Sequence, residues 1–202
     1  MPDVPTPDAT RQKILDAAER QFRQFGYQKT TTTDIAKACG MSPANLYRFF
    51  ASKSAIMEDL CTRLLGEASG VLETIAFEAS SAEDRLIRVV EYIHWYTCER
   101  ILDSSQMNDM VTAAMQENWT AISKHLFRVR SLIVKIIRDG IADGSFPEQD
   151  AERAAACFHS GFIKWGHPIL VAQAEKAGVP SPTAREIARF LIGGVKQGLT
   201  ED

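Results

Sequence analysis

Three polar residues close together, Asn45, Tyr47 and Arg48, carry side chains suited to nucleic-acid chemistry. Arginine can make a bidentate contact to guanine, asparagine can do so to adenine, and a tyrosine hydroxyl can donate to phosphate. A helix over this stretch turns Leu46 and Phe50 inward and leaves the three polar residues on its outer face. The alternative is an ordinary solvated face, because helices that never meet DNA show the same spacing.

Two short helices joined by a tight turn are predicted to position these side chains. Thr31 and Asp34 have the spacing of a capping box, which satisfies free backbone N–H groups where a helix begins. Gly40 supplies the left-handed conformation that ends this first helix after about two turns. Ser42 is a good N-cap for the second helix, and Pro43 suits its first position. Together they predict a helix-turn-helix, whose second helix enters the DNA major groove.

The run TTTTDIAKACGMSPANLYRFFASKSAI resembles the N-terminal DNA-binding domain of the TetR (tetracycline repressor) family. The family pattern is T-T-x-x-D-I-A, then A-G-V-S, then L-Y-x-x-F-x-S-K, and the resemblance extends from Thr10 to about Leu65 without a gap. The chain departs from it mildly, with Cys39 for the usual Ala, Met41 for Val, and Pro43-Ala44 for a small-Gly pair. The last departure lies at recognition positions, so it puts the operator sequence in doubt and leaves the fold intact. The resemblance implies that Thr32 and Thr33 open onto DNA, that Pro43, Ala44, Asn45 and Arg48 approach bases, and that Tyr47 and Lys53 hold phosphates.

Charge and composition agree with a site-specific DNA binder. The segment 11–57 holds eight basic and three acidic residues, a net charge of +5, whereas the whole chain carries −3. Because the basic residues are concentrated in this segment and the rest of the chain is acidic, only this part of the protein should attract phosphate. The alternative is that the uneven charge distribution arose by chance. Neither a run of about 18 apolar residues nor a signal-peptide core occurs, so we expect a cytoplasmic protein that does not span a membrane.

No cofactor, metal or catalytic site is expected. The chain has no G-x-S-x-G, P-loop, H-E-x-x-H or glycine-rich dinucleotide turn. His94 and Cys98 lie one helical turn apart and offer a metal two ligands at most. The four cysteines are widely spaced, which predicts reduced and mostly buried thiols: Cys39, Cys61, Cys98 and Cys157.

The fold class predicted throughout is all-α, because no segment keeps a period of two residues. We expect a three-helix DNA-binding domain over residues 1–52 and a larger helical effector-binding and dimerisation domain over 53–202. Apolar spacing and capping signals predict helices at about 10–25, 31–39, 43–50, 53 to beyond 75, 82–102, 104–115, 117–143, 150–176 and 183–199. The helix over 150–176 should break at Gly166-His167-Pro168, and Ser181 with Pro182 should cap the last one.

Two sets of residues in the C-terminal domain are assigned to binding. Large aromatic and flexible side chains can line a pocket for a small apolar or aromatic effector, with ordinary core packing as the alternative: Tyr92, Trp95, Tyr96, Met110, Trp119, Phe158 and Phe162. The last two helices have spare apolar surface, and in the resembled family they form a four-helix dimer interface. The residues expected there, unless they close the monomer core, are Phe158, Phe162, Trp165, Ile187, Phe190, Leu191 and Val195.

The sequence therefore predicts a homodimeric transcriptional regulator, a repressor that binds a palindromic operator in double-stranded DNA. A small apolar or aromatic effector would release it. The alternative is an all-α small-molecule enzyme or carrier that does not bind DNA, which predicts no salt-dependent binding to any duplex.

Overall fold

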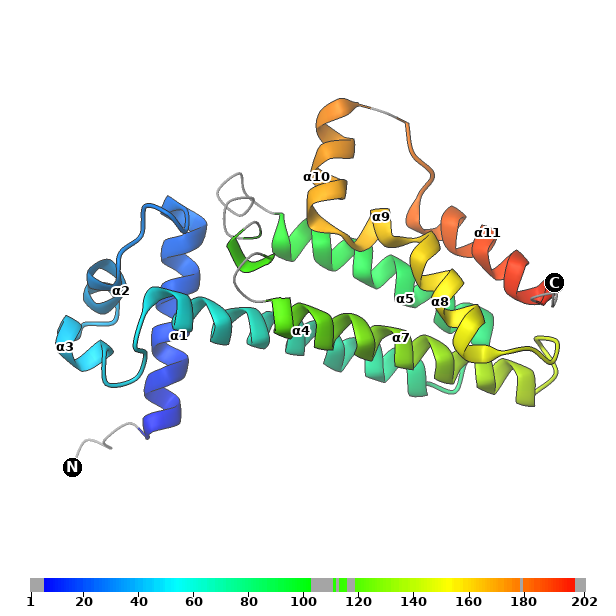
Figure 1. The fold of residues 1–202 in the computed structure, drawn as a ribbon, viewed down its shortest axis with the longest axis horizontal. Helices are drawn as coiled ribbons and strands as arrows, with labels where there is room; N and C mark the ends of the chain where they lie inside the picture. Colours follow the sequence, from blue (N-terminus) through cyan, green and yellow to red (C-terminus); the bar gives the residue numbers. More distant parts are fainter. Residues whose placement is uncertain (1–5, 103–110, 112, 116–118, 179, 199–202) are drawn as a thin grey trace. The chain divides into compact units, whose positions relative to one another are not determined.

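The computed structural model describes residues 6–102, 111, 113–115, 119–178 and 180–198 (Figure 1). All regular secondary structure in these residues is helical, which confirms the predicted all-α class. Most of the helix predicted over 104–115 lies outside the described residues. None of the described helices is both long and apolar enough to cross a membrane.

The described residues form two compact units. We call residues 6–65, with the described part of 103–122, the head, and residues 66–102 with 123–198 the body. Helix α4 (Lys53–Phe77) begins at the expected domain boundary, and its residues as far as Leu65 belong to the head.

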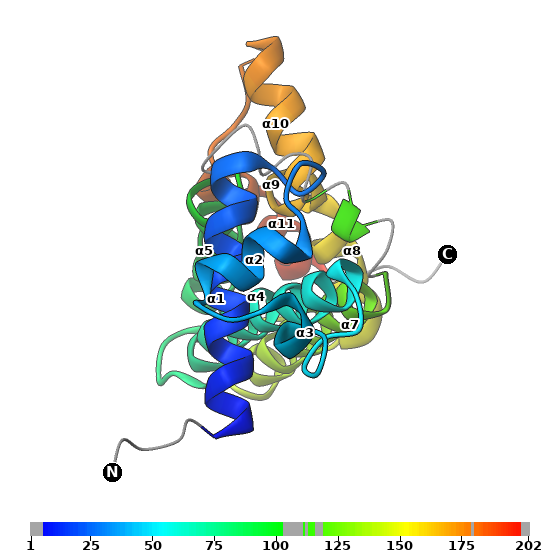
Figure 2. The same ribbon diagram turned by 90° about the vertical axis from the view of Figure 1, so that its left-hand side faces the viewer.

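The head contains α1 (Pro7–Phe25), α2 (Thr32–Ala38), α3 (Pro43–Leu46) and the first part of α4. Helix α2 packs against α1 and against α3, and Figure 2 shows α2 and α3 from the front, with α1 behind them. Apolar residues one turn apart on α1 face inward, and Phe22 is fully buried with Ile35 of α2 and Leu46 of α3. Phe50, which precedes α4, and Ile56 in the first turn of α4 complete this core. The core holds α3 in place although it is only four residues long.

The body contains the rest of α4 and the helices that follow: α5 (Ala82–Tyr96), η1 (Thr97–Ile101), α7 (Trp119–Ala142), α8 (Ala151–Gly161), α9 (Ile163–Gly166), α10 (Pro168–Ala177) and α11 (Ala184–Gln197). Helix α5 continues into the π-helical turn η1, so the prediction of helix as far as about 102 is confirmed. The predicted break at Pro168 is also present, because His167 takes an extended conformation before it.

Two details of the predicted helices were wrong. The segment 150–176 breaks a second time at Phe162, between α8 and α9. The cap of α11 is Thr183, and neither Ser181 nor Pro182 fills that position. Thr183 and Glu186 exchange backbone and side-chain hydrogen bonds as a capping box, which satisfies two free N–H groups where Ser181 would satisfy one.

Helix α11 packs against α5 and α8 in the body. A Cβ atom at Gly161 would lie 2.4 Å from Cδ2 of Leu191, so glycine permits this close approach of α8 and α11. Phe158, Phe162 and Val195 are buried in the same core. The monomer already covers these three side chains, which agrees with the alternative that they close the monomer core.

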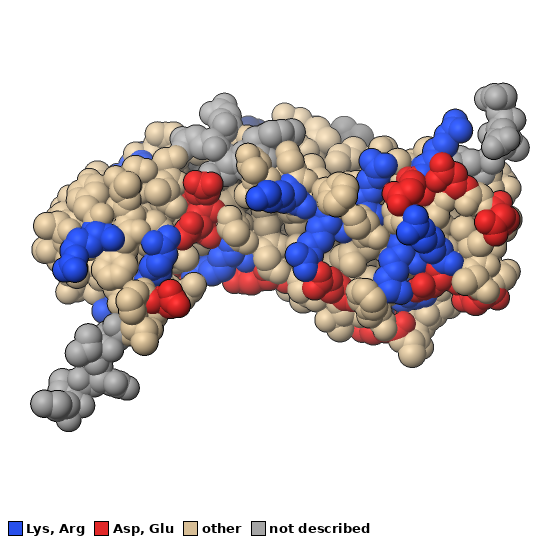
Figure 3. Space-filling view, turned by 60° about the horizontal axis from the view of Figure 1, so that its bottom comes forward, with Lys and Arg blue, Asp and Glu red and all other residues tan. Residues whose placement is uncertain are grey.

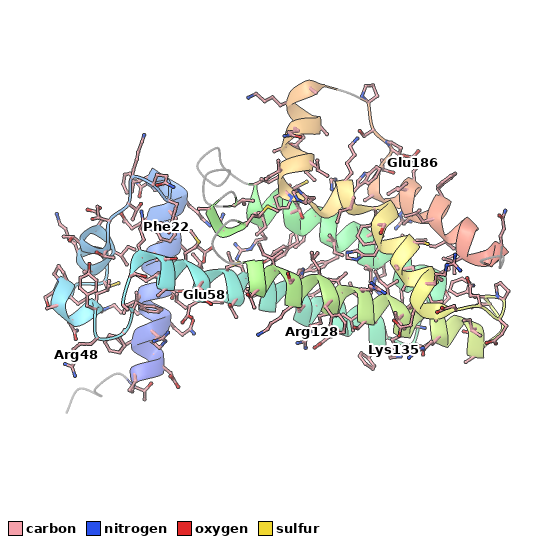
Figure 4. The ribbon with its side chains drawn as sticks, in the orientation of Figure 1. Phe22, Arg48, Glu58, Arg128, Lys135 and Glu186 are labelled. Atoms are coloured by element: carbon pink, nitrogen blue, oxygen red, sulfur yellow. The ribbon has the colours of Figure 1, made fainter. Side chains whose placement is uncertain are left out.

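An ion pair between buried Arg85 and partly exposed Asp139 joins three helices of the body. The guanidinium of Arg85 donates to the Ala76 carbonyl at 2.8 Å and to Asp139 Oδ2 at 2.6 Å, and Lys135 Nζ lies 2.7 Å from the same carboxylate. Burial raises the pKa of Asp139, but hydrogen bonds and charges from Lys135 and Arg85 outweigh it and hold the pKa below its ordinary value. Lys135 also lies over the ring of Phe77 (Figure 4).

The cysteines are free thiols, as expected, but fewer are buried than predicted. Cys39 and Cys61 are buried, and burial raises the pKa of Cys61 to about 11. Cys98 is partly buried and Cys157 is exposed. In the part of the chain that the structure describes, no three His, Cys, Asp or Glu side chains gather in a way that could hold a metal.

Candidate DNA-binding interface

The local geometry of the helix-turn-helix follows its capping signals. Thr31 Oγ1 accepts from the Asp34 N–H at 3.2 Å, and Asp34 Oδ2 accepts from the Thr31 N–H at 2.9 Å. The side-chain and backbone hydrogen bonds from Thr31 hold the pKa of Asp34 below its ordinary value. Gly40 has φ +67°, and Ser42 Oγ accepts from the Asn45 N–H at 3.2 Å. The predicted capping box, turn and N-cap are all confirmed.

The outer face of α3 is available to a partner. Pro43 and Ala44 are exposed, Asn45 is partly exposed, and Tyr47 is 51% exposed. Arg48 is exposed and its guanidinium bonds to none of the described residues. Figure 4 shows Arg48 pointing away from the head helices. The residues expected to approach bases therefore share one open surface.

A hydrogen bond links α2 to the end of α3. The hydroxyls of Thr32 and Tyr47 lie 2.9 Å apart, and either can donate. Thr33 is exposed in the first turn of α2. The structure thus brings the hydroxyls of Thr32 and Tyr47 together, and hydroxyls of this kind are suited to phosphate oxygens.

Lys53 has a different environment from the one expected of a phosphate contact. Its ammonium donates to the carbonyls of Tyr27 at 2.8 Å and Thr30 at 3.1 Å, and it lies 4.3 Å from the centre of the Tyr27 ring. The loop between α1 and α2 leaves these carbonyls without helical partners, and an ammonium satisfies both. Lys53 therefore has an internal role that its motif does not reveal, and its role at phosphate stays a prediction.

The remaining basic residues of the head differ in how far they are neutralised. Arg11 pairs with Asp59, Arg23 with Glu19, and Arg63 with Asp16 and Glu19. Five exposed cations have no bonding partner among the described residues: Lys13, Arg20, Lys29, Lys37 and Arg48. Basic and acidic side chains lie side by side over much of the face in Figure 3, and in the body Arg128 pairs with Glu73 and Arg138 with Glu152. The head therefore offers positive charge that its own carboxylates leave free.

The residues expected to line an effector pocket do not all share one environment. Tyr92 stacks near Trp95 and Tyr96, with ring centres 5.7 and 5.9 Å away, but Trp95 is 51% exposed. Tyr92 and Trp95 line a surface groove with Val71 and Ile75, whereas Phe158 and Phe162 lie in the core. Met110 and the side chain of Trp119 lie outside the described residues.

Sequence reasoning missed a polar cluster in the body. Ser69 of α4 and His125 of α7 share a hydrogen bond of 3.0 Å, and His159 of α8 lies near them with its ring centre 5.3 Å from that of Phe162. Burial, then the charges of His159 and Arg128, lowers the pKa of His125 to about 4. Burial also lowers the pKa of His159. The spacing of His125 from Ile122 and Val129 places it on the inner face of α7, which was the available signal.

Comparison with known proteins identifies both halves of the chain. Residues 14–60 match the family model "Bacterial regulatory proteins, tetR family", and residues 82–185 match "Tetracyclin repressor-like, C-terminal domain". The HTH-type transcriptional repressor KstR2 of Mycolicibacterium smegmatis is 24% identical, over 97% of this chain and 96% of its own length. The HTH-type regulator YhgD of Bacillus subtilis is 29% identical, over 70% and 74%.

Solved structures of regulators share the fold. A TetR-family structure from Mesorhizobium loti has a TM-score of 0.70 at 19% identity, with 96% of each chain covered. FadR of Bacillus subtilis, solved with stearoyl-CoA, has a TM-score of 0.63 at 17% identity, with 94% of this chain and 99% of that chain covered.

Proposed function

Because the chain belongs to the TetR family of DNA-binding transcriptional regulators, we propose that it is a ligand-responsive repressor that binds a palindromic operator as a homodimer. A small effector would release it from the operator, and the protein would act in the cytoplasm. The family consists of regulators, so the chain is not an enzyme.

The observation that carries the proposal is the open face of α3. Arg48 has no internal bond to give up, so it can meet guanine without breaking a contact within the protein. Asn45 lies one turn back on the same face, and Ala44 can touch a thymine methyl group. Tyr47, already oriented by Thr32, would position the helix through the phosphate backbone.

A homodimer would supply the second half-site. Two-fold symmetry places one recognition helix in each of two successive major grooves, about 34 Å apart. Phe190 on α11 is 79% exposed, with Ile187 and Leu191 partly buried beside it. This apolar surface supports self-association, because an isologous interface needs one such patch on each copy.

Release requires that the effector bind one state of the dimer better than the other. Moving a 1:99 population to 99:1 takes about 5.5 kcal/mol of differential affinity. We place the polar part of the effector against Ser69 and His125, and its apolar part among aromatic residues of the body. His125 is neutral at pH 7, so it would recognise a hydrogen-bonding group without providing a charge.

Selection from a random duplex pool tests DNA recognition. We expect the wild-type protein to enrich one inverted repeat, with affinity that falls steeply as salt rises. Failure to enrich any sequence, with no salt-dependent binding, would contradict the proposal.

The selected duplex then tests release. Stearoyl-CoA is a practical first compound, because FadR was solved with it, and a panel of small apolar and aromatic metabolites would follow. His125→Leu should keep operator affinity and lose the response to whichever compound releases the wild-type protein. An unchanged response would show that the effector binds elsewhere.

A further inference from the structure

The recognition segment is too short to hold its own orientation. Helix α3 spans Pro43–Leu46 only, and the chain continues to Phe50 through turns that end with the Phe50 N–H bonded to the Leu46 carbonyl at 3.1 Å. One turn of helix has little stability of its own, even with the turn hydrogen bonds that continue to Phe50. Contacts from neighbouring helices must therefore set the angle at which Asn45 and Arg48 are presented.

Arg11 of α1 makes two such contacts at the end of this segment and a third contact to α4. One guanidinium nitrogen donates to the Phe49 carbonyl at 2.7 Å, and the other donates to Asp59 Oδ2 of α4 at 2.5 Å. The guanidinium carbon lies 4.2 Å from the centre of the Phe50 ring. The planar fork of arginine suits this arrangement, because it bonds two acceptors in different directions while it stacks on an aromatic face.

The carbonyl that Arg11 binds belongs to the residue next to Arg48. A shift of Phe49 would therefore move the base of the Arg48 side chain directly. Asp59 fixes the guanidinium from the opposite side, since its helix α4 is anchored independently by Ile56, Met57 and Leu60 in the head core.

We propose that Arg11 and Asp59 are positioning residues for sequence recognition: they hold the end of α3 against α1 and α4, and neither contacts DNA. The inference rests on the proposed use of α3 as the recognition helix. Stability alone does not account for the arrangement, because the two side chains are 38% and 41% exposed and ion pairs of that kind contribute about 0 to 1 kcal/mol.

Substitution of Asp59 tests the proposal, because an electrostatic role and a positioning role predict different changes in DNA binding. Removing a negative charge from a DNA-binding domain should tighten binding to every duplex if only electrostatics matters. If Asp59 positions Arg11, Asp59→Asn should instead lower the preference for the selected operator over a scrambled duplex of equal length. We expect that preference to fall about tenfold, which lies in the lower part of the range that one well-placed bidentate base contact supplies.

Arg11→Lys separates position from charge, because lysine keeps the charge but cannot bond both acceptors in the planar geometry. Its preference for the selected operator over the scrambled duplex should fall about as much as that of Asp59→Asn. Its affinity for the scrambled duplex and the salt dependence of that affinity should not change. The double variant should be no worse than either single one, because both remove the same connection. Arg20→Gln is the matched control: it removes an exposed, unpaired cation from the same helix, and should leave discrimination unchanged.

These measurements distinguish a positioning role of Arg11 and Asp59 from a direct phosphate contact by Arg11. A lower salt slope and equal losses on both duplexes in Arg11→Gln would mean that Arg11 contacts phosphate, and would overturn the proposal. Unchanged discrimination in Arg11→Lys and Asp59→Asn would also overturn it. Thermal unfolding of each variant shows whether equal losses come from unfolding of the head. Failure of the wild-type protein to select any operator would instead reject the proposed function itself.

Discussion

Replacement of Phe190 by aspartate tests the proposed dimer at its most exposed apolar residue. A phenylalanine buries about 150 to 250 Å² when it is covered, and Phe190 is 79% exposed, so a partner can remove roughly 150 Å² from water. At about 25 cal/mol per Å² this amounts to nearly 4 kcal/mol for each ring, and symmetry contributes two rings. Truncations of such anchors typically cost 2 to 4 kcal/mol. We expect Phe190→Asp to raise the dimer dissociation constant by at least about a hundredfold.

Sedimentation over nanomolar to micromolar concentrations measures this change. Phe127→Asp is the matched control, because Phe127 of α7 is 75% exposed but lies outside the proposed interface. At concentrations where the proteins are monomeric, both variants should unfold at nearly the wild-type temperature, since neither ring contributes to the core. Equal dimerisation of Phe190→Asp and wild type, or an equal loss in Phe127→Asp, would refute the placement of the interface on α11.

Four further changes test the site and the core. Arg48→Ala should cost about 1 to 3 kcal/mol on the selected operator and relax its sequence preference, measured by titration against single-base variants; an unchanged preference would exclude Arg48 from base contact. Lys53→Ala should lower the unfolding temperature of the protein as well as its affinity for all duplexes, because the carbonyls of its loop lose their donor, and normal thermal stability would contradict the internal role. Asp139→Asn should lower the free energy of unfolding in urea by about 2 to 4 kcal/mol, because the buried guanidinium of Arg85 loses its carboxylate partner. Glu152→Gln, which removes the exposed ion pair with Arg138, should lower it by less than about 1 kcal/mol. Burial gives His125 a folded-state pKa of about 4, below the ordinary histidine value, so the unfolded chain binds the proton first as pH falls. Between pH 6.5 and pH 5 the free energy of unfolding should therefore drop by about 1.5 kcal/mol more in the wild type than in His125→Gln, and an equal drop in both would refute the assignment.

Local signals in the head could be read from the sequence because they act over three or four residues. The pair Thr31 and Asp34 forms the expected capping box, and Gly40 takes the expected left-handed conformation. Burial of Leu46 and exposure of Arg48 follow from helical periodicity alone. Each of these features needs only the identity of near neighbours.

Features that depend on distant residues could not be read in this way. Arg11 lies 38 residues from the carbonyl it binds, and no local spacing pairs them. Phe158 and Phe162 looked equally suited to a pocket, an interface or a core, because aromatic residues serve all three. Only the packing of the body shows that both side chains are buried in its core.

Three cations of the head show why residue type and position do not suffice to assign a contact. Arg48 is free, Arg11 is bonded to a carbonyl and a carboxylate, and Lys53 is bonded to two carbonyls. Hydrogen bonds to charged groups contribute about 1.5 to 3 kcal/mol each, so a phosphate that displaced Lys53 from its loop would have to offset most of that gain. Loss of Lys53 should therefore lower the stability of the head whether or not its ammonium also contacts phosphate, because the carbonyls of Tyr27 and Thr30 lose their donor.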